Sequence, residues 1–333
     1  MGYYLGVDVG SLTTKLALID RSGELVYADC RRNDGGPIEA VQKIFAGAKI
    51  DCYPVAAAGT TGSGRHLAAV IIGADTVVNE ITAHALAART VEPAVQTVID
   101  IGGQDSKIIY LKNGVSVGFN MNTVCAAGTG SFLDHQAARL GLPVEELGHY
   151  ALRSTSPVAI AGRCGVFAES DLIHKQQLGY RKEDLIAGLC LALAKNYITN
   201  VARSRKVEPV VLFQGGVAAN VGMRWALEKL LNVKLQVPPH YQVMGALGAA
   251  LLARSRHRDG KIRETRCRGA REVAGADFQV KGFICRDCAN SCELSELYAD
   301  GVLAGRWGSR CGKWADLERR QPESVQEKTR AFT

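Results

Sequence analysis

Two aspartates, each followed seven positions later by a lysine, are the side chains in this sequence best suited to phosphate chemistry. Asp8 and Lys15 form the first pair, and Asp100 and Lys107 form the second. In both stretches the aspartate interrupts an apolar run and glycine follows closely. A carboxylate at the end of a strand can bind Mg²⁺ or its water ligands, and glycine lets phosphate oxygens approach the backbone amides. The pattern therefore predicts a metal–phosphate site.

The two stretches also resemble each other beyond the lysine. Each continues into a second β-type run and a turn, Ser22-Gly23 in the first and Asn113-Gly114 in the second, and Asn-Gly is a strong hairpin signal. An internal repeat of this kind predicts two related halves that face each other. The alternative is a chance likeness between two glycine-containing strands.

Other residues could shape the same site. A strand at residues 209–213 leads into Gly215-Gly216 and then a helix, a turn that lets a flat ring lie against the backbone and so suits adenosine. Glu80 and His84 share one face of an alanine-rich helix. Such a pair is usually a surface pair or a satisfied core contact, and a role in shaping a nucleotide cleft is the alternative.

Two isolated cysteines, Cys125 and Cys164, each precede an expected helix. A helix N-terminus carries partial positive charge and unpaired N–H groups, which stabilise a thiolate or donate to the sulfurs of a metal cluster. On spacing alone we favour two small buried apolar side chains, because these cysteines form no CxxC pair.

The cysteines near the C-terminus give a stronger metal signal. Cys285, Cys288 and Cys292 are closely spaced, and Cys311 follows eighteen residues after the third. Zinc would take four thiolates and hold together a small domain that lacks a core. A second 4Fe–4S cluster would use the same ligands and is the alternative we favour over zinc. The structural cysteines are expected to be Cys30, Cys52, Cys190 and Cys267.

Length and composition predict a soluble protein of more than one domain. The 333 residues contain 47% hydrophobic and 22% charged side chains, values that are ordinary for a globular protein. No secretory signal and no apolar run long enough for a bilayer are recognisable. The ten cysteines are therefore expected to serve metal or redox chemistry in a reducing cytoplasm, with no membrane partner.

The net charge of +7 is unevenly distributed. Residues 254–272 contain eight Lys/Arg against three acids and no interleaved aromatics, so we interpret them as a solvated linker, not a nucleic-acid site. The resulting division is a core at 1–254, with halves of about 1–95 and 96–254, a basic linker at 255–274 and a cysteine-rich extension at 275–333.

Five segments together resemble a known family, the 2-hydroxyacyl-CoA dehydratase activators and the ATPase subunits of benzoyl-CoA reductase (BadF/BadG/BcrA/BcrD type). These segments are NEITAHA (79–85), VIDIGGQDSK (98–107), MNTVCAAGTGSFLD (121–134), CGVFAESD (164–171) and FQGGVAAN (213–220). The resemblance spans about Tyr3 to Arg254 and implies an α/β fold with two ribonuclease-H-like, actin-like ATPase halves around a nucleotide cleft. Two departures are Ser63, where the family usually has an aromatic residue, and the extension to residue 333.

The resemblance implies ATP and Mg²⁺ as cofactors. Asp8 and Asp100 would orient Mg²⁺ and its waters, and Gln104 or Asp105 would position the attacking water. The remaining nucleotide contacts would be Gly10, Ser11, Lys15, Gly102, Gly103, Lys107, Gly215, Gly216 and Asn220.

The resemblance also reverses the interpretation of the two isolated cysteines. In that family a homodimer holds one 4Fe–4S cluster, to which each subunit would give Cys125 and Cys164. The implied function is ATP-dependent, low-potential electron donation to an iron–sulfur dehydratase or reductase, with ferredoxin or flavodoxin as the electron donor. The alternatives are the ATPase subunit of a benzoyl-CoA-type or double-cubane-cluster reductase, a small-molecule kinase without a cluster, and a chaperone-like ATPase.

Overall fold

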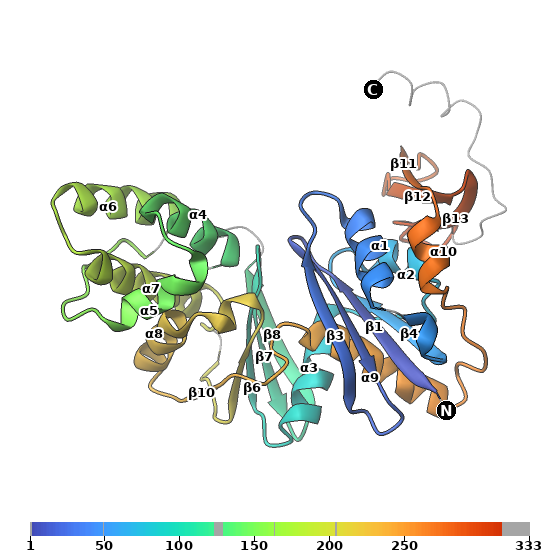
Figure 1. Ribbon diagram of the computed structural model, residues 1–333, viewed down its shortest axis with the longest axis horizontal. Helices are drawn as coiled ribbons and strands as arrows, with labels where there is room; N and C mark the ends of the chain where they lie inside the picture. Colours follow the sequence, from blue (N-terminus) through green and yellow to red (C-terminus); the bar gives the residue numbers. More distant parts are fainter. Residues whose placement is uncertain (1, 49, 123–128, 163, 204, 315–333) are drawn as a thin grey trace.

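A computed structural model describes residues 2–48, 50–122, 129–162, 164–203 and 205–314. In this part of the chain there are two five-stranded sheets, helices packed on them, and a separate three-stranded sheet near the C-terminus (Figure 1). None of the helices described is both long enough and apolar enough to cross a membrane.

The first sheet has the strand order β3-β2-β1-β4-β5. Strands β1 to β3 form an antiparallel meander, and β4 and β5 then add in parallel beside β1. Because β1 is covered on both faces, its apolar residues run almost without interruption. The elements of this half are β1 (Tyr3–Val9), β2 (Thr13–Ile19), β3 (Leu25–Arg32), α1 (Pro37–Gly47), the 3₁₀ turn η1 (Ile50–Cys52), β4 (Val55–Thr61), α2 (Arg65–Ile72), β5 (Thr76–Val77) and α3 (Glu80–Val91).

The second sheet repeats this topology with the order β10-β9-β6-β7-β8. Strands β6 to β8 form the meander, and β9 and β10 add in parallel beside β6. The predicted internal repeat and the α/β class are thus confirmed. The elements are β6 (Thr97–Ile101), β7 (Ser106–Lys112), β8 (Val115–Asn122), α4 (Gly130–Leu140), α5 (Val144–Leu152), α6 (Gly165–Gln177), α7 (Lys182–Asn200), β9 (Val211–Gln214), the 3₁₀ turn η2 (Gly216–Ala219), α8 (Val221–Leu231) and β10 (Leu235–Gln236).

Helix α9 (Met244–Arg258) returns from the second half to the first. It packs against β1, β4 and α3, and its buried alanines share a core with both sheets. The small residues that open α9 therefore serve close packing. A boundary drawn only by sequence position, with 96–254 as the second half, does not show this return.

The C-terminal extension consists of α10 (Ala270–Gly275), β11 (Phe278–Ile284), β12 (Glu293–Ala299) and β13 (Val302–Trp307). Its three strands form one antiparallel sheet, and α10 packs on α1 of the first half. The basic segment before it is attached to that half, because the Asp75 carboxylate accepts hydrogen bonds from Thr265 Oγ1 (2.7 Å) and from the Arg266 backbone N–H (2.9 Å). The residues predicted as a solvated linker thus include specific contacts.

Candidate functional site

The second aspartate–lysine pair lies in a buried cluster of charges. Asp100 on β6 and Lys107 on β7 are direct cross-strand partners. The Lys107 ammonium, whose side chain is 3% exposed, lies 2.7 Å from Glu80 Oε2, 2.9 Å from Asp105 Oδ2 and 3.6 Å from Asp100 Oδ2. One cation therefore compensates three carboxylates, and this contact explains why Glu80 begins helix α3 at this point.

Burial and charge act in opposite directions on these groups. Burial alone would raise the pKa of Asp100, but the charges of His84, Lys107 and Lys15 outweigh it and hold that pKa below its ordinary value of 3.8. Burial would likewise lower the pKa of Lys107, whereas Asp100, Glu80 and Asp105 together raise it well above 10.5. Both groups are therefore ionised at neutral pH.

The first pair has the same register with fewer partners. Asp8 on β1 and Lys15 on β2 are cross-strand neighbours, and Lys15 Nζ donates to Asp8 Oδ2 at 3.2 Å. The Lys15 side chain is 20% exposed and has this single carboxylate within ion-pair distance among the residues described. Although burial would lower it, the pKa of Lys15 is raised, chiefly by Asp8. Lys15 is therefore the less committed of the two lysines.

The turns of the two hairpins meet. A Cβ atom added to Gly103 would lie 2.5 Å from Leu12 Cδ1, so a side chain larger than hydrogen would force the turns apart. Behind Asp8, a Cβ atom on Gly245 would lie 2.6 Å from Asp8 Oδ2 and 3.4 Å from His84 Cε1. The structure thus brings Asp8 and Asp100, from different halves, to one place.

His84 and Gln214 complete this cluster, and neither had a defined role from the sequence. Gln214 Nε2 lies 2.6 Å from His84 Nδ1, and His84 Nε2 lies 3.7 Å from Asp100 Oδ2. The signal for His84 was its helical spacing from Glu80, and that for Gln214 was its place at the end of a predicted strand before two glycines. The geometry favours the interpretation in which Glu80 and His84 shape the site.

Two polar atoms in this region are buried without a hydrogen-bond partner in the described structure, Thr61 Oγ1 and Gln214 Oε1. Thr61 is the parallel-strand neighbour of Asp8, and Gln214 is that of Asp100. Each orphaned oxygen therefore accompanies one aspartate. Buried polar atoms of this kind ordinarily bind a water, an ion or a ligand, so their position fits a hydrated metal ion between the halves.

The other predicted nucleotide contacts differ in how freely they can meet a ligand. Ser11 and Gln104 are exposed, whereas Asp105 is engaged by Lys107. Gly215 has φ +84°, a conformation that favours glycine, and Gly216 is open at the position of its missing Cβ. The Asn220 side chain accepts a hydrogen bond from Met223 N at 3.0 Å and caps helix α8, so it positions that helix.

Helix α4 begins directly on the second phosphate turn. Gly130 N donates to Gly102 O at 2.9 Å, and Ser131 N donates to Gly103 O at 2.8 Å. Cys125, predicted as a cluster ligand, precedes this helix and lies outside the described residues. The glycine turn and the helix that follows this cysteine are therefore linked by main-chain hydrogen bonds.

Cys164, the second predicted cluster ligand, is the half-buried N-cap residue of α6. Beyond it, the exposed side chains of Val166 and Phe167 form an apolar surface. Helices α4 and α6 are joined by Arg139 Nη1 and Glu169 Oε1, 2.7 Å apart. A thiol at an exposed helix N-terminus suits a cluster shared with another chain.

The four cysteines of the extension lie at one edge of its sheet. Cys285, Cys288 and Cys292 occupy the β11–β12 connection, and Cys311 follows β13. Within the described ranges, no three His, Cys, Asp or Glu side chains, here or at the hairpins, have an arrangement that would already hold a metal ion.

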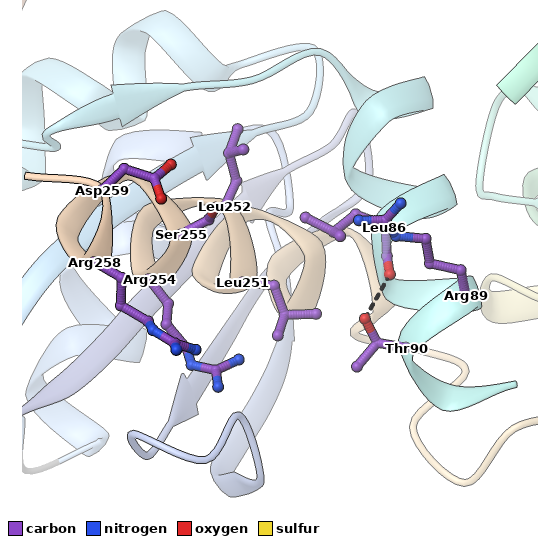
Figure 2. A pocket seen from close by; sticks show the side chains of 9 residues that line it. All are labelled: Leu86, Arg89, Thr90, Leu251, Leu252, Arg254, Ser255, Arg258 and Asp259. Carbon is purple, nitrogen blue, oxygen red and sulfur yellow. Dashed lines mark hydrogen bonds between the residues drawn. The ribbon is translucent and has the colours of Figure 1, made fainter. Parts of the chain in front are cut away.

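A pocket between α3 and α9 is separate from the hairpins (Figure 2). Its basic lining residues are Arg89, Arg254 and Arg258. Arg254 donates to the backbone carbonyls of Arg21 (2.9 Å) and Ser22 (2.7 Å), so its guanidinium holds the β2–β3 turn. No predicted site residue lines this pocket.

Comparison with known proteins agrees with this arrangement. Residues 5–253 match the BadF/BadG/BcrA/BcrD ATPase family. The chain is 40% identical over 254 residues to the (R)-2-hydroxyglutaryl-CoA dehydratase activating ATPase of Acidaminococcus fermentans, covering 75% of this chain and 96% of that protein.

Solved structures are similar as well. The component A structure of the Acidaminococcus fermentans dehydratase has a TM-score of 0.71 at 39% identity, covering 77% of this chain and 99% of that one. The activator of 2-hydroxyisocaproyl-CoA dehydratase from Clostridium difficile, with bound ADPNP, also has a TM-score of 0.71, at 34% identity, covering 78% and 97%. The chain belongs to the BadF/BadG/BcrA/BcrD ATPase family.

Proposed function

We propose that this ATPase is an ATP-driven electron donor that activates an iron–sulfur dehydratase of the 2-hydroxyacyl-CoA class. The observation that carries the proposal is the direct attachment of α4 to the Gly102–Gly103 turn. A ligand that binds this turn also acts on the helix that follows Cys125, so nucleotide chemistry and the cysteine segment share one mechanical element.

Mg·ATP would bind where the two hairpins meet. Asp8 and Asp100 would orient the metal and its waters, with the orphaned oxygens of Thr61 and Gln214 as further polar partners. Lys15 would contact phosphate, because only part of its charge is compensated within the described structure. Gln104, which is exposed, is better placed than Asp105 to position the attacking water, since Lys107 already binds Asp105.

The remaining nucleotide contacts follow from the turns. Gly10, Ser11, Gly102 and Gly103 would cradle phosphate oxygens with their backbone amides. Gly215 and Gly216 would lie under the adenosine, where the missing side chain of Gly216 leaves room. Asn220 would contribute indirectly, by capping α8.

A 4Fe–4S cluster held by Cys125 and Cys164 of two identical subunits would supply one-electron transfer at low potential. This chain contributes the two thiols and the helices that begin after them. Arg139 and Glu169 join α4 to α6, so a shift of α4 is passed to the helix that Cys164 caps. The exposed Val166 and Phe167 beside Cys164 fit a surface covered by the second subunit.

The acceptor is assigned from the names of the relatives, two of which activate 2-hydroxyacyl-CoA dehydratases. A ferredoxin or flavodoxin would reload the cluster. An ATPase subunit of a benzoyl-CoA-type or double-cubane-cluster reductase is the second candidate, because the matched family carries the names of both branches. The acceptor proteins encoded beside this gene would discriminate between the two.

Anaerobic purification with iron and sulfide analysis tests the cluster. We expect cluster absorbance and about one 4Fe–4S per dimer in a Cys288→Ser/Cys292→Ser background, which removes iron bound by the extension. Cys125→Ser or Cys164→Ser should abolish that signal and leave ATP binding intact. The exposed Cys52 provides the matched control, Cys52→Ser. A colourless, iron-free protein that phosphorylates a small molecule would instead identify a kinase.

A further inference from the structure

We infer that Cys285, Cys288, Cys292 and Cys311 form a structural four-thiolate metal site within one chain, separate from the ATPase core. The fold gathers them. Strand β11 ends just before Cys285 and β12 begins just after Cys292, so the first three cysteines share one connection. Strand β13 runs antiparallel to β12, and therefore the segment after it, with Cys311, emerges at the same edge of the sheet.

Side-chain contacts join the two cysteine-bearing segments. The Trp314 indole N–H donates to Cys285 Sγ at 3.3 Å, and its ring packs edge-on against Phe283 with 5.0 Å between centroids. Lys313 forms an ion pair with Asp287. Residues 311–314 are thus held against the connection that contains the other three cysteines.

The local backbone is also shaped for ligands close in sequence. Cys285 N donates to Cys292 O at 2.8 Å, so the first and third cysteines remain paired across the hairpin. Ser291 N donates to Cys288 O at 3.2 Å, and Ser291 has φ +42°, which closes a tight turn around Cys288. An N–H donor to a cysteine sulfur, as Trp314 provides, stabilises the thiolate form that a metal requires.

The interior of this region is small. Its buried apolar cluster consists of Phe283, Cys285, Leu294 and Trp314. Small domains with so little core usually depend on a disulfide or a metal, and Cys285, Cys288 and Cys292 are free thiols. The thiols are not yet grouped as a finished site within the described ranges, so metal binding would draw the exposed Cys288 and Cys311 inward.

The position of the site favours a structural role over an electron relay within one chain. The extension packs on α1 and α2 of the first half, whereas Cys164 and helices α4 and α6 belong to the second half. Figure 1 shows β11–β13 and α6 at opposite ends of the long axis. Either zinc or a small iron–sulfur cluster satisfies four thiolates.

Full-length protein carrying Cys164→Ser isolates the new site from the proposed intersubunit cluster. After anaerobic expression with both metals supplied, we expect one zinc, or one cluster with matching sulfide, per chain. Adding Cys288→Ser/Cys292→Ser should remove that metal, and adding Cys52→Ser should not. Less than about one-fifth of an equivalent of either metal in the first variant, or full retention in the second, would overturn the site.

A second measurement guards against a variant that merely misfolds. Metal-loaded protein with the natural tail should protect four more thiols from alkylation than the same protein after chelation, as mass spectrometry of the labelled peptides would show. Chelation should also expose the region after Gly275 to protease while ATP binding by the core persists. Equal alkylation of the four cysteines before and after chelation would contradict the inference.

Discussion

The two hairpins share one backbone plan and differ in how their lysines are used. Asp8–Lys15 and Asp100–Lys107 occupy the same cross-strand register in sheets of the same topology. Lys107 is nearly inaccessible and is bound by three carboxylates, whereas Lys15 is partly exposed and has one such partner among the residues described. Duplication thus supplied two equivalent positions, and the side chains around them gave each a separate task.

The difference follows from the elements packed on each hairpin. Helix α3 brings Glu80 and His84 onto the second pair, and the β6–β7 turn adds Asp105. Beside the first pair, α9 presents Gly245, which leaves Asp8 without a side-chain neighbour at that point. We therefore expect Lys107 to stabilise the junction of the halves and Lys15 to contact ATP.

Replacing Lys107 should have the largest effect on stability. Lys107→Met leaves Glu80, Asp100 and Asp105 without their shared cation, and removing one partner of a buried charge cluster costs about 3–5 kcal/mol. Urea unfolding at neutral pH measures this loss. The exposed Lys112 at the end of the same strand offers a matched control, Lys112→Met, expected to change stability by about 0.5 kcal/mol or less. Equal stability of the two variants would refute the special place of Lys107.

Replacing Lys15 should reverse the balance of effects. Lys15→Met removes a charge-assisted phosphate contact worth about 1.5–3 kcal/mol, which corresponds to roughly a 10- to 100-fold rise in the Kd for Mg·ATP. Calorimetric titration of ATP tests this, with the exposed Lys43→Met as the control. If Lys15→Met lost as much stability as Lys107→Met and bound ATP normally, the two lysines would have to be regarded as equivalent.

Changing Glu80 should give an intermediate result. Glu80→Gln removes one of the three carboxylates, but Asp100 and Asp105 still compensate Lys107, so we expect a loss of about 1 kcal/mol. The comparison variant is Glu264→Gln, an exposed acid outside the cluster. A loss as large as that of Lys107→Met would show that Asp100 and Asp105 contribute little to holding the lysine.

The smallest expected effect concerns acid stability. The pKa of Asp100 is lowered in the folded state, so its contribution to stability is complete above its ordinary value of 3.8 and is lost as the pH falls below that value toward the folded pKa. Unfolding free energies measured across this acidic range should fall less steeply for Asp100→Asn than for the unmodified protein. Parallel curves would mean that Asp100 is not stabilised as an ion.

The paired aspartates and lysines could be predicted because a repeated local pattern encodes a repeated hairpin. The helix that ends before Gly141 was predictable for the same local reason, and Gly141 indeed has φ +66°. The unequal partners of Lys15 and Lys107 could not be predicted, because Glu80 reaches Lys107 through tertiary packing of α3. The return of α9 to the first sheet also depends on long-range packing that no local pattern reveals.

The central claim is that nucleotide binding at the hairpins acts on the cluster cysteines through α4. The rate at which a ferrous chelator extracts iron from the anaerobic protein reports this coupling, measured with and without Mg·ATP in the Cys288→Ser/Cys292→Ser background. We predict that Mg·ATP changes the rate several-fold, and that Asp100→Asn removes the dependence on nucleotide. An extraction rate that is the same with and without Mg·ATP, in protein that still hydrolyses ATP, would contradict the account.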